Sequence, residues 1–345
     1  MKPAAQPAGR AGGLRSAGRR AATYLDFTRP FTLLPPTLGV VSGAVTAWGS
    51  AWNPDPARRV TADVVLTVVL GSLCAALLNA ASNGINQYYD IDIDRRNKPS
   101  RHLVTGAISM RAGFWFSMAL YVAAILPTWL VVVHPHEGLR AKLSAPLVAH
   151  ECAAIYLVGM LFTFIYSAPA LGRTKRHGIL ANLTIAIPRG CLLKVAGWSM
   201  VASVLHLEPW FIGGVFFLFL LGASTTKDYS DMEGDRLGGC RTLPIVYGVR
   251  RSAWMIAPCF VVPWLLLPVG AWLENPFDPG HTVLTGNRWT LTALGTGLAC
   301  WGLYVCWLIL KRPEELAEVE NHISWKHMYL MMMAAQAGFA LAYLV

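Results

Sequence analysis

The sequence predicts an all-α, polytopic membrane protein, and its composition supports this fold class in two ways. Of its 345 residues, 54% are hydrophobic and only 14% are charged, whereas about 25% of the residues of a typical soluble domain are charged. The 31 Gly, 21 Pro and 13 Trp residues also fit a membrane protein, because Gly and Pro are common in membrane-spanning helices and Trp is common at the membrane surface. A soluble or disordered protein is therefore excluded.

The apolar stretches of the chain predict about nine transmembrane helices. A helix needs about 20 apolar residues to cross a bilayer. Such stretches cover residues 31–50, 60–88, 112–133, 149–170, 179–200, 208–226, 253–273, 289–310 and 326–345. The fifth stretch is the least typical, because it contains Pro188, Arg189 and Lys194.

The basic residues predict the orientation of these helices. Lys and Arg accumulate in cytoplasmic loops, and most of the 29 Lys and Arg residues fall on one side if the N-terminus is cytoplasmic. We therefore expect a cytoplasmic N-terminus, or its matrix or stromal equivalent in an organelle. The net charge of +10 reflects this topology, so no nucleic-acid partner is expected. Protein partners cannot be inferred from the sequence.

The N-terminal residues 1–25 differ from the rest of the chain. They contain several Arg residues and no acidic residue, and they lack the apolar segment of a cleaved signal peptide. We expect a flexible basic tail, or an organellar transit segment, followed by a single transmembrane domain over residues 26–345.

Two acidic windows share one residue pattern. Residues 86–95 align without a gap with residues 227–236. The identical pairs are Tyr88 and Tyr229, Asp90 and Asp231, Asp94 and Asp235, and Arg95 and Arg236. This similarity predicts an internal duplication, with two pseudo-repeated helical bundles around a central cavity.

Helical spacing places most of the acidic residues on two polar stripes. Residues three or four apart share one face of a helix. The first stripe consists of Asn79, Asn83, Asn86, Asp90 and Asp94, and the second of Ser224, Asp228, Asp231 and Asp235. Asp92 and Glu233 lie two residues off the stripes and point elsewhere.

The stripes predict a site for a divalent cation. Several carboxylates that face one cavity repel one another unless a cation neutralises them. Oxygen ligands without His or Cys indicate a hard ion, and magnesium commonly uses carboxylates together with substrate phosphates. The basic residues expected on the same side of the membrane, which are available to hold such an anion, are Lys98, Arg101, Arg173, Lys175, Arg176, Lys227 and Arg241.

A single acidic run at a helix end is commonly just a solvated surface. Here two windows have the same spacing, and the first stripe continues as Asn residues into an apolar helix. Polar residues inside the membrane are costly and are typical of functional sites. The pattern therefore favours a site over a solvated surface.

At these motifs the sequence resembles the UbiA-type intramembrane prenyltransferases. The first family motif, N-[DQ]-x-x-D-x-x-x-D, is matched by Asn86, Gln87, Asp90 and Asp94, and the second, D-x-x-D-x-x-x-D, by Asp228, Asp231 and Asp235. The Asp-Ile-Asp-Ile-Asp run at 90–94, Asn-Lys-Pro at 97–99 and Arg-Gly at 189–190 are most similar to the homogentisate prenyltransferase branch. The chlorophyll synthase branch and the archaeal-type lipid branch come next.

The resemblance implies transfer of a prenyl group from an allylic isoprenoid diphosphate to a small aromatic acceptor, similar to homogentisate or hydroxybenzoate, within the lipid bilayer. Asp90, Asp94, Asp231 and Asp235 would be catalytic. It implies one Mg²⁺ on Asn86, Asp90 and Asp94 and a second on Asp228, Asp231 and Asp235, with Mn²⁺ as a possible substitute. Tyr166 would join the basic residues around the diphosphate, and Arg29 and Arg189 would bind the acceptor.

Departures from the family pattern leave the acceptor open. Pro-Ala-Leu-Gly-Arg-Thr at 169–174 and Arg-His-Leu-Val at 101–104 differ from the usual sequences of this branch. A chlorin alcohol, a glycerol-phosphate lipid or a carotenoid end group are the alternatives, and the donor length ranges from C10 to C20. A secondary transporter of anionic solutes is less favoured, because it would place ionisable residues near the membrane midplane.

Overall fold

The computed structural model describes residues 9–132, 138–320 and 322–345. Within these ranges it contains helices and no strands. The helices of the N-terminal half are α1 (Gly9–Phe27), α2 (Leu34–Gly49), α3 (Ala62–Tyr89), α4 (Ile91–Asn97), α5 (Met110–Ile125), α6 (Leu139–Leu143) and α7 (Glu151–Ser167). Those of the C-terminal half are α8 (Ile179–Ala186), α9 (Leu193–Trp198), α10 (Leu207–Ala223), α11 (Asp228–Leu237), α12 (Leu243–Tyr247), α13 (Val249–Ile256), α14 (Val262–Trp272), α15 (Arg288–Lys311), α16 (Glu315–Glu318) and α17 (Ile323–Leu344).

Short 3-10 and π-helical turns connect or extend several of these helices. The 3-10 turns are η1 (Pro30–Leu33), η2 (Leu126–Leu130), η3 (Leu147–Ala149), η4 (Pro169–Leu171), η5 (Thr174–Arg176), η7 (Ser224–Lys227) and η8 (Ala257–Phe260). The turn η6 (Ile187–Leu192) is π-helical and joins α8 to α9. Pro188 lies in this turn, where its missing N–H costs one helical hydrogen bond. The fifth predicted helix is therefore present despite its proline.

The predicted fold class is confirmed, but the count of nine spans is not. In the described residues, seven helical segments are long and apolar enough to cross a membrane: Pro30–Gly49, Ala62–Tyr89, Met110–Leu130, Ile179–Trp198, Leu207–Leu237, Val249–Trp272 and Arg288–Lys311. Helix α7 is apolar but has only 17 residues. Helix α17 has 22 residues, and polar side chains such as Lys326, His327 and Gln336 reduce its hydropathy.

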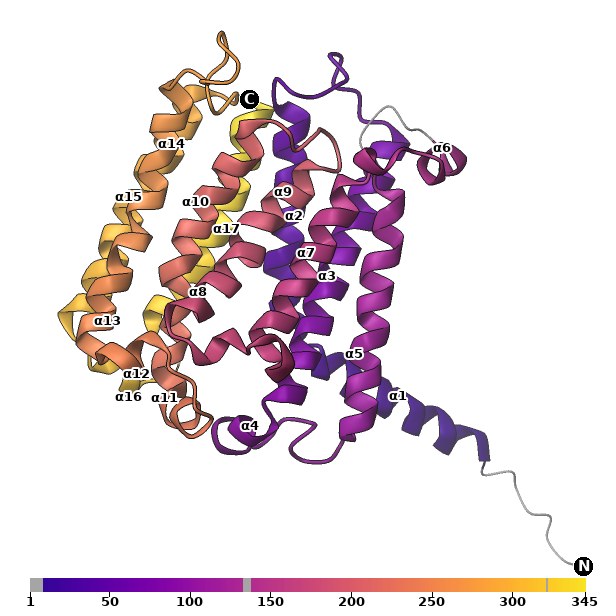
Figure 1. Ribbon diagram of the computed structural model, residues 1–345, viewed down its shortest axis with the longest axis vertical. Helices are drawn as coiled ribbons and strands as arrows, with labels where there is room; N and C mark the ends of the chain where they lie inside the picture. The colour runs from indigo at the N-terminus through magenta and orange to yellow at the C-terminus, as the bar shows by residue number, and fades with distance from the viewer. Residues whose placement is uncertain (1–8, 133–137, 321) are drawn as a thin grey trace, which may run out of the picture.

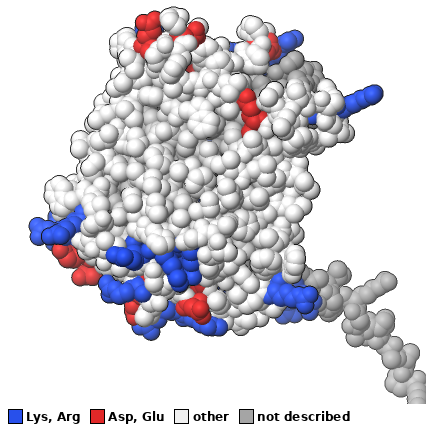
Figure 2. Space-filling model, in the orientation of Figure 1, with Lys and Arg blue, Asp and Glu red and all other residues white. Residues whose placement is uncertain are grey.

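The long helices run side by side, and the short helices α4, α11, α12 and α16 gather at one end of the bundle (Figure 1). We call this the α4–α11 end. The C-terminus lies at the opposite end, while α1 projects from the α4–α11 end. Lys, Arg, Asp and Glu gather toward the two ends and leave a broad uncharged band between them (Figure 2). Such a band is what a bilayer core requires of its protein.

Small residues allow the central helices to pack closely. A Cβ atom on Gly197 of α9 would lie 2.1 Å from the carbonyl oxygen of Val40 in α2, so only glycine permits this approach. Close packing of this kind drives helix association in membranes, where no hydrophobic effect acts between helices. The fully buried aromatic residues Trp198, Phe216, Phe219, Trp264 and Phe339 belong to the same core.

Helix α1 covers most of the predicted N-terminal tail, and residues 1–8 lie outside the described part of the chain. Phe27 at the end of α1 is only 1% exposed and packs with Leu103 and Ile108. The last turn of α1 is thus anchored beside the loop that follows α4.

Candidate active site

Each acidic window lies at the end of a long helix, where the chain changes direction and a short helix begins. Helix α3 ends at Tyr89, and α4 begins at Ile91, with only Asp90 between them. The amide of Asp94 still donates to the carbonyl oxygen of Asp90 at 2.8 Å, so the first stripe keeps its helical register across the break. In the second window the turn η7 separates α10 from α11, which begins at Asp228.

Asn97 and Lys98 join the two windows directly. The side-chain amide of Asn97 donates to the carbonyl oxygen of Asp231 at 3.2 Å, and its oxygen accepts from the amide of Gly234 at 3.1 Å. The Nζ atom of Lys98 lies 2.9 Å from Oδ2 of Asp231. Residues far apart in the chain therefore form one cluster, at the α4–α11 end.

The carboxylates of the first window are buried and paired with cations. Asp90 is 8% exposed and forms ion pairs with Lys175 and, at 3.0 Å, with Arg173. Asp94 is 3% exposed and pairs with Arg101. Burial raises the pKa of Asp94, and the Arg101 charge opposes this shift. The first window is thus electrically compensated by the protein itself.

The second window has fewer ion pairs than the first. Of the three carboxylates on its polar stripe, only Asp231 has an ion pair among the described residues, and neither Asp228 nor Asp235 has one. Asp235 and Asp231 repel the charge of Asp228, whereas Lys227 and Lys98 attract it. Three neighbouring carboxylates beside two lysines, Lys98 and Lys227, leave excess negative charge in a partly buried site.

Asn86 and Tyr166 lie beside these carboxylates. The amide of Asn86 donates to Oγ of Ser167 at 3.3 Å. Tyr166 interacts electrostatically with Asp228, Asp90 and Asp235, which places it between the two windows. Sequence reasoning did not identify Ser167 or Asn97 as site residues.

Three of the predicted diphosphate-binding residues have other neighbours. The side chains of Arg176 and Arg241 are exposed, and neither forms an ion pair in the part of the chain that the structure describes. Their backbones are linked, because the amide of Arg241 donates to the carbonyl oxygen of Arg176 at 3.3 Å. Lys227 donates to Oγ of Ser230 at 3.2 Å. By contrast, Lys98, Arg101, Arg173 and Lys175 all contact the carboxylates.

The two predicted acceptor-binding arginines lie within electrostatic range of each other. Burial, followed by the charges of Arg101 and Arg189, lowers the pKa of Arg29. Arg29 also has a left-handed backbone with φ of 59°, a strained conformation of the kind found at functional sites. Arg189 lies in the π-helical turn η6, and such turns are also common at functional sites. These arginines concentrate positive charge next to the carboxylates.

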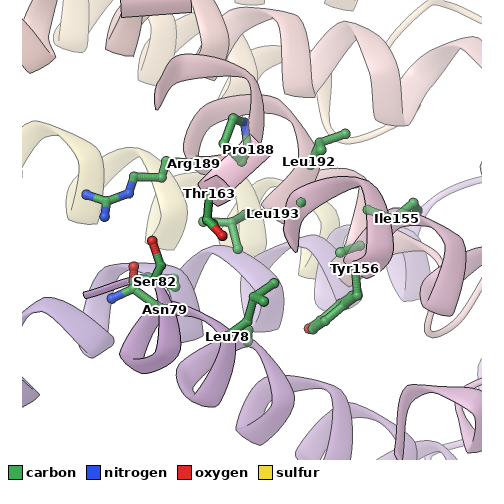
Figure 3. A pocket seen from close by; sticks show the side chains of 14 residues that line it. Leu78, Asn79, Ser82, Ile155, Tyr156, Thr163, Pro188, Arg189, Leu192 and Leu193 are labelled. Carbon is green, nitrogen blue, oxygen red and sulfur yellow. The ribbon is translucent and has the colours of Figure 1, made fainter. Parts of the chain in front are cut away.

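An apolar pocket opens beside Arg189 (Figure 3). It lies between α2, α3, α7, η6 and α9, and we call it the α3–α7 pocket. Arg189, Asn79 and Ser82 lie at one end of it, and Ile155 and Tyr156 lie at the other. The remaining wall consists largely of apolar side chains such as Leu78, Leu192 and Leu193.

The donor atoms of the site fit a magnesium ion bound together with a phosphate ligand. In the described residues, no three His, Cys, Asp or Glu side chains form a metal site by themselves. Magnesium is usually held by one or two carboxylates and by substrate phosphate oxygens, so it does not need such a group. The excess negative charge around Asp228 and Asp235 is the observation that favours a cation here.

Several known proteins are similar to this chain. Residues 33–323 match the UbiA prenyltransferase family. Digeranylgeranylglyceryl phosphate synthase of Natronomonas pharaonis is 31% identical over 247 residues, covering 69% of this chain and 75% of that protein. Chlorophyll synthase of Arabidopsis thaliana is 28% identical over 236 residues, covering 67% of this chain and 55% of that protein.

Solved structures share the fold. A UbiA homologue from Archaeoglobus fulgidus, solved with GPP and Mg²⁺, has a TM-score of 0.65 and 19% identity, and the match covers 94% of this chain and all of that one. The structure of a digeranylgeranylglyceryl phosphate synthase matches with a TM-score of 0.65 and 22% identity. Together with the family match, these likenesses establish an integral, multi-pass membrane enzyme that transfers prenyl groups. The chain belongs to the UbiA prenyltransferase family.

Proposed function

We propose that this enzyme transfers an isoprenoid chain from an allylic diphosphate to a non-aromatic acceptor that carries an anionic group. The observation that carries the proposal is the joining of the two acidic windows by Asn97 and Lys98, beside a group of carboxylates whose charge is only partly balanced. A diphosphate bound through divalent cations would complete the charge balance of this site. The homologue structures solved with GPP or DMAPP and Mg²⁺ support this donor class.

Two Mg²⁺ ions are proposed, the first held by Asn86, Asp90 and Asp94. Asp228, Asp231 and Asp235 would hold the second, and Mn²⁺ would substitute for either. When bound, such ions stabilise the negative charge that grows on the diphosphate as the allylic C–O bond breaks. The Cd²⁺ complex of the Archaeoglobus fulgidus homologue supports a site for divalent cations.

The basic residues of the site would then change partners. Lys175, Arg173 and Arg101 now pair with Asp90 and Asp94. With the charge of these carboxylates balanced, the three side chains would be free to donate charge-assisted hydrogen bonds to the phosphate oxygens. Tyr166, between the two windows, would donate from its hydroxyl to the same group. Arg176, Lys227 and Arg241 would contribute charge from the rim of the site.

The reaction breaks the C–O bond of the donor, and the electron pair leaves with the diphosphate. The acceptor oxygen then bonds to the allylic carbon and loses its proton to the released diphosphate. The pocket must keep water away from the allylic cation, and its largely apolar wall would do so.

The acceptor proposal differs from the first expectation. The sequence motifs predicted an aromatic acceptor, but the similar proteins named above make digeranylgeranylglyceryl phosphate and chlorophyll by name. This comparison favours a non-aromatic acceptor. Arg29 and Arg189 would bind its anionic group, since no carboxylate of the described chain forms an ion pair with either. A glycerol phosphate lipid is the acceptor class that we propose first.

The experiment is an acceptor panel with purified enzyme in detergent. The enzyme, Mg²⁺ and a geranylgeranyl donor are incubated with a glycerol phosphate lipid, a chlorophyllide, homogentisate or 4-hydroxybenzoate, and products are detected by mass. We expect product with the glycerol phosphate lipid, and a loss of it in an Arg189→Gln variant. Product formed only with the aromatic acceptors would overturn the acceptor proposal, and product formed in excess chelator would overturn the metal proposal.

A further inference from the structure

A second pocket lies at the end of the bundle opposite the acidic windows, where the C-terminus and the loop after α14 also lie (Figure 1). We call it the α10–α14 pocket, because the start of α10 and the loop after α14 form most of its wall. Its volume of about 540 Å³ is in the range of sites that hold small molecules. The residues that line it are Trp52, Leu205, His206, Leu207, Trp210, Asn275, Phe277 and Asp278.

We propose that the α10–α14 pocket binds the zwitterionic head group of a phospholipid. Asp278 and the aromatic rings of the wall would hold the ammonium group, and the side-chain amide of Asn275 would donate to the phosphate. This site lies apart from the acidic windows and does not depend on the proposed reaction. Four features of the pocket support this occupant: its charge, its rings, its free amide and its apolar rim.

The charge of the pocket favours a cationic group. Asp278 lines it, and there is no Lys or Arg among the described residues that do so. His281 contacts Asp278, with Nδ1 at 2.9 Å from Oδ2, and a neutral histidine leaves the charge of the carboxylate in place. Burial lowers the pKa of His206, although the charges of Asp278 and Glu151 oppose this shift. The His206 ring is therefore neutral near pH 7 and does not repel a cation.

Aromatic rings form much of the wall. Trp52 stacks on His206, with ring centroids 4.1 Å apart. The indole N–H of Trp210 donates to the carbonyl oxygen of Val204 at 2.7 Å, which fixes the orientation of this ring. Trp210 and Phe277 are nevertheless 44% and 81% exposed, so both rings are available to a ligand. Aromatic faces attract ammonium groups, and clusters of such rings recognise the quaternary ammonium of choline.

Asn275 supplies a buried hydrogen-bond donor that has no partner. The residue is only 3% exposed, and its Oδ1 atom accepts from the amide of Phe277 at 3.0 Å. This bond identifies the other atom of the side-chain amide as Nδ2, and no described residue accepts a hydrogen bond from Nδ2. A buried N–H group without a partner is unfavourable. A phosphate oxygen in the pocket would accept from it, which gives the head group its second contact.

The rim of the pocket suits the acyl chains of a membrane lipid. Leu205 on the rim is 89% exposed although it is apolar. Charged side chains reappear at this end of the molecule, beyond the uncharged band of the surface (Figure 2), so the pocket lies where the bilayer core meets the head groups. Tryptophan is common at this level of a membrane. An acyl chain beside Leu205, with its head group in the pocket, would cover an apolar surface that a soluble amine would leave exposed.

The test is lipid binding to the purified full chain in detergent, measured by native mass spectrometry over a range of lipid concentrations. Phosphatidylethanolamine is the probe. Phosphatidylglycerol with the same acyl chains is the comparison, because it lacks the ammonium group and is attracted to the basic residues of the α4–α11 end instead. Free phosphoethanolamine should displace phosphatidylethanolamine only at far higher concentrations, since it has no acyl chain to cover Leu205. Competition as effective as that of the lipid, or no binding of phosphatidylethanolamine, would overturn the inference.

Two substitutions assign the binding to this pocket. Trp210→Leu removes an aromatic ring from the wall, and Asp278→Asn removes the charge. We expect each to weaken phosphatidylethanolamine binding by about fivefold or more and to leave phosphatidylglycerol binding unchanged. The matched controls are Trp289→Leu and Glu318→Gln, whose side chains are exposed outside the pocket. Neither control should change the binding of either lipid.

Asp278→Lys keeps the test decisive if Trp210→Leu does not fold, because the Asp278 side chain is 43% exposed in a loop. This variant should weaken phosphatidylethanolamine binding further and strengthen phosphatidylglycerol binding. Unchanged phosphatidylethanolamine binding in the folded Asp278→Asn and Asp278→Lys proteins would contradict the inference. An equal fall in the binding of both lipids in Trp210→Leu or Asp278→Asn would contradict it as well.

Discussion

The two acidic windows contain matching residues but differ in how their charges are balanced. In the first, Asp90 and Asp94 are buried and each is paired with Lys175, Arg173 or Arg101. In the second, Asp228 and Asp235 have no ion pair in the described chain and Asp231 has only Lys98. A sequence repeat therefore does not imply equal electrostatics, because the basic partners come from loops that are not repeated.

This difference assigns distinct tasks to the windows. The first is preorganised by its own cations, which hold the carboxylates in place before the substrate arrives. The second carries the repulsion that a divalent ion relieves, so it would supply most of the binding energy for the metal. Substitutions in each window separate these two tasks.

Neutralising one ligand in either window should nearly abolish turnover. We expect Asp90→Asn and Asp231→Asn each to reduce product formation by about a thousandfold, since each removes a group that stabilises the leaving diphosphate. The matched controls are Asp92→Asn and Glu233→Gln, whose carboxylates lie off the stripes and are 84% and 69% exposed. The measurement is product yield by mass per amount of folded protein. Equal losses in ligands and controls would show that the stripes do not define the site.

Neutralising one carboxylate in each window should have opposite effects on stability. Without divalent cations, Asp90→Asn leaves buried Lys175 and Arg173 unpaired and should destabilise the fold by about 3 kcal/mol. Asp228→Asn removes like-charge repulsion and should stabilise it by about 1 kcal/mol. Thermal unfolding of the purified variants in detergent and excess chelator measures both. A shift of the same sign in both variants would refute the proposed difference between the windows.

The link between the windows should depend on Gly234. A Cβ atom there would lie 2.2 Å from Oδ1 of Asn97, so Gly234→Ala must displace Asn97 from Asp231 and Gly234. We expect a loss of about 1–2 kcal/mol in stability, as for a buried hydrogen-bonding group left unpaired, together with lower activity. Gly297→Ala, which meets no atom within 4 Å, is the control and should be neutral or slightly stabilising. Undiminished activity in Gly234→Ala would show that the Asn97 contact is dispensable.

The exposed ion pair between Arg96 and Glu233 should contribute least to the stability of the fold. It also joins α4 to α11, but its side chains are 60% and 69% exposed. Because water screens such a pair, Arg96→Gln should change the stability by less than about 1 kcal/mol. A thermal shift as large as that of Gly234→Ala would mean that the surface pair, rather than Asn97, holds the windows together.

Sequence patterns placed the carboxylates on two stripes because helical spacing is local. The spacing of Asn86, Asp90 and Asp94 placed them on one face, and this register survives the break after Tyr89 through the bond from Asp94 to Asp90. The exposed side chains of Asp92 and Glu233 confirm the off-stripe prediction. The contacts of Asn97 and Ser167 were not predicted, because each depends on a partner from a distant segment that spacing does not reveal.

The span count and the α3–α7 pocket show the same limit of sequence patterns, which do not reveal how distant segments pack. Counting apolar residues found every long helix, but it could not tell that α7 is too short and α17 too polar to be assigned as spans by length and composition. The wall of the α3–α7 pocket also depends on tertiary packing, since a hydrogen bond to Gly71 of another helix holds Tyr156 in it. Nothing in the local sequence around Tyr156 indicates that role.

The most direct test of the central claim is Mg²⁺-dependent binding of an unreactive prenyl thiodiphosphate, measured by calorimetry. The claim is that both windows hold one diphosphate through divalent ions. We predict tight binding by the unchanged enzyme in Mg²⁺, and none in chelator or in either Asp90→Asn or Asp231→Asn. Undiminished binding in chelator, or in either of these variants, would contradict the account.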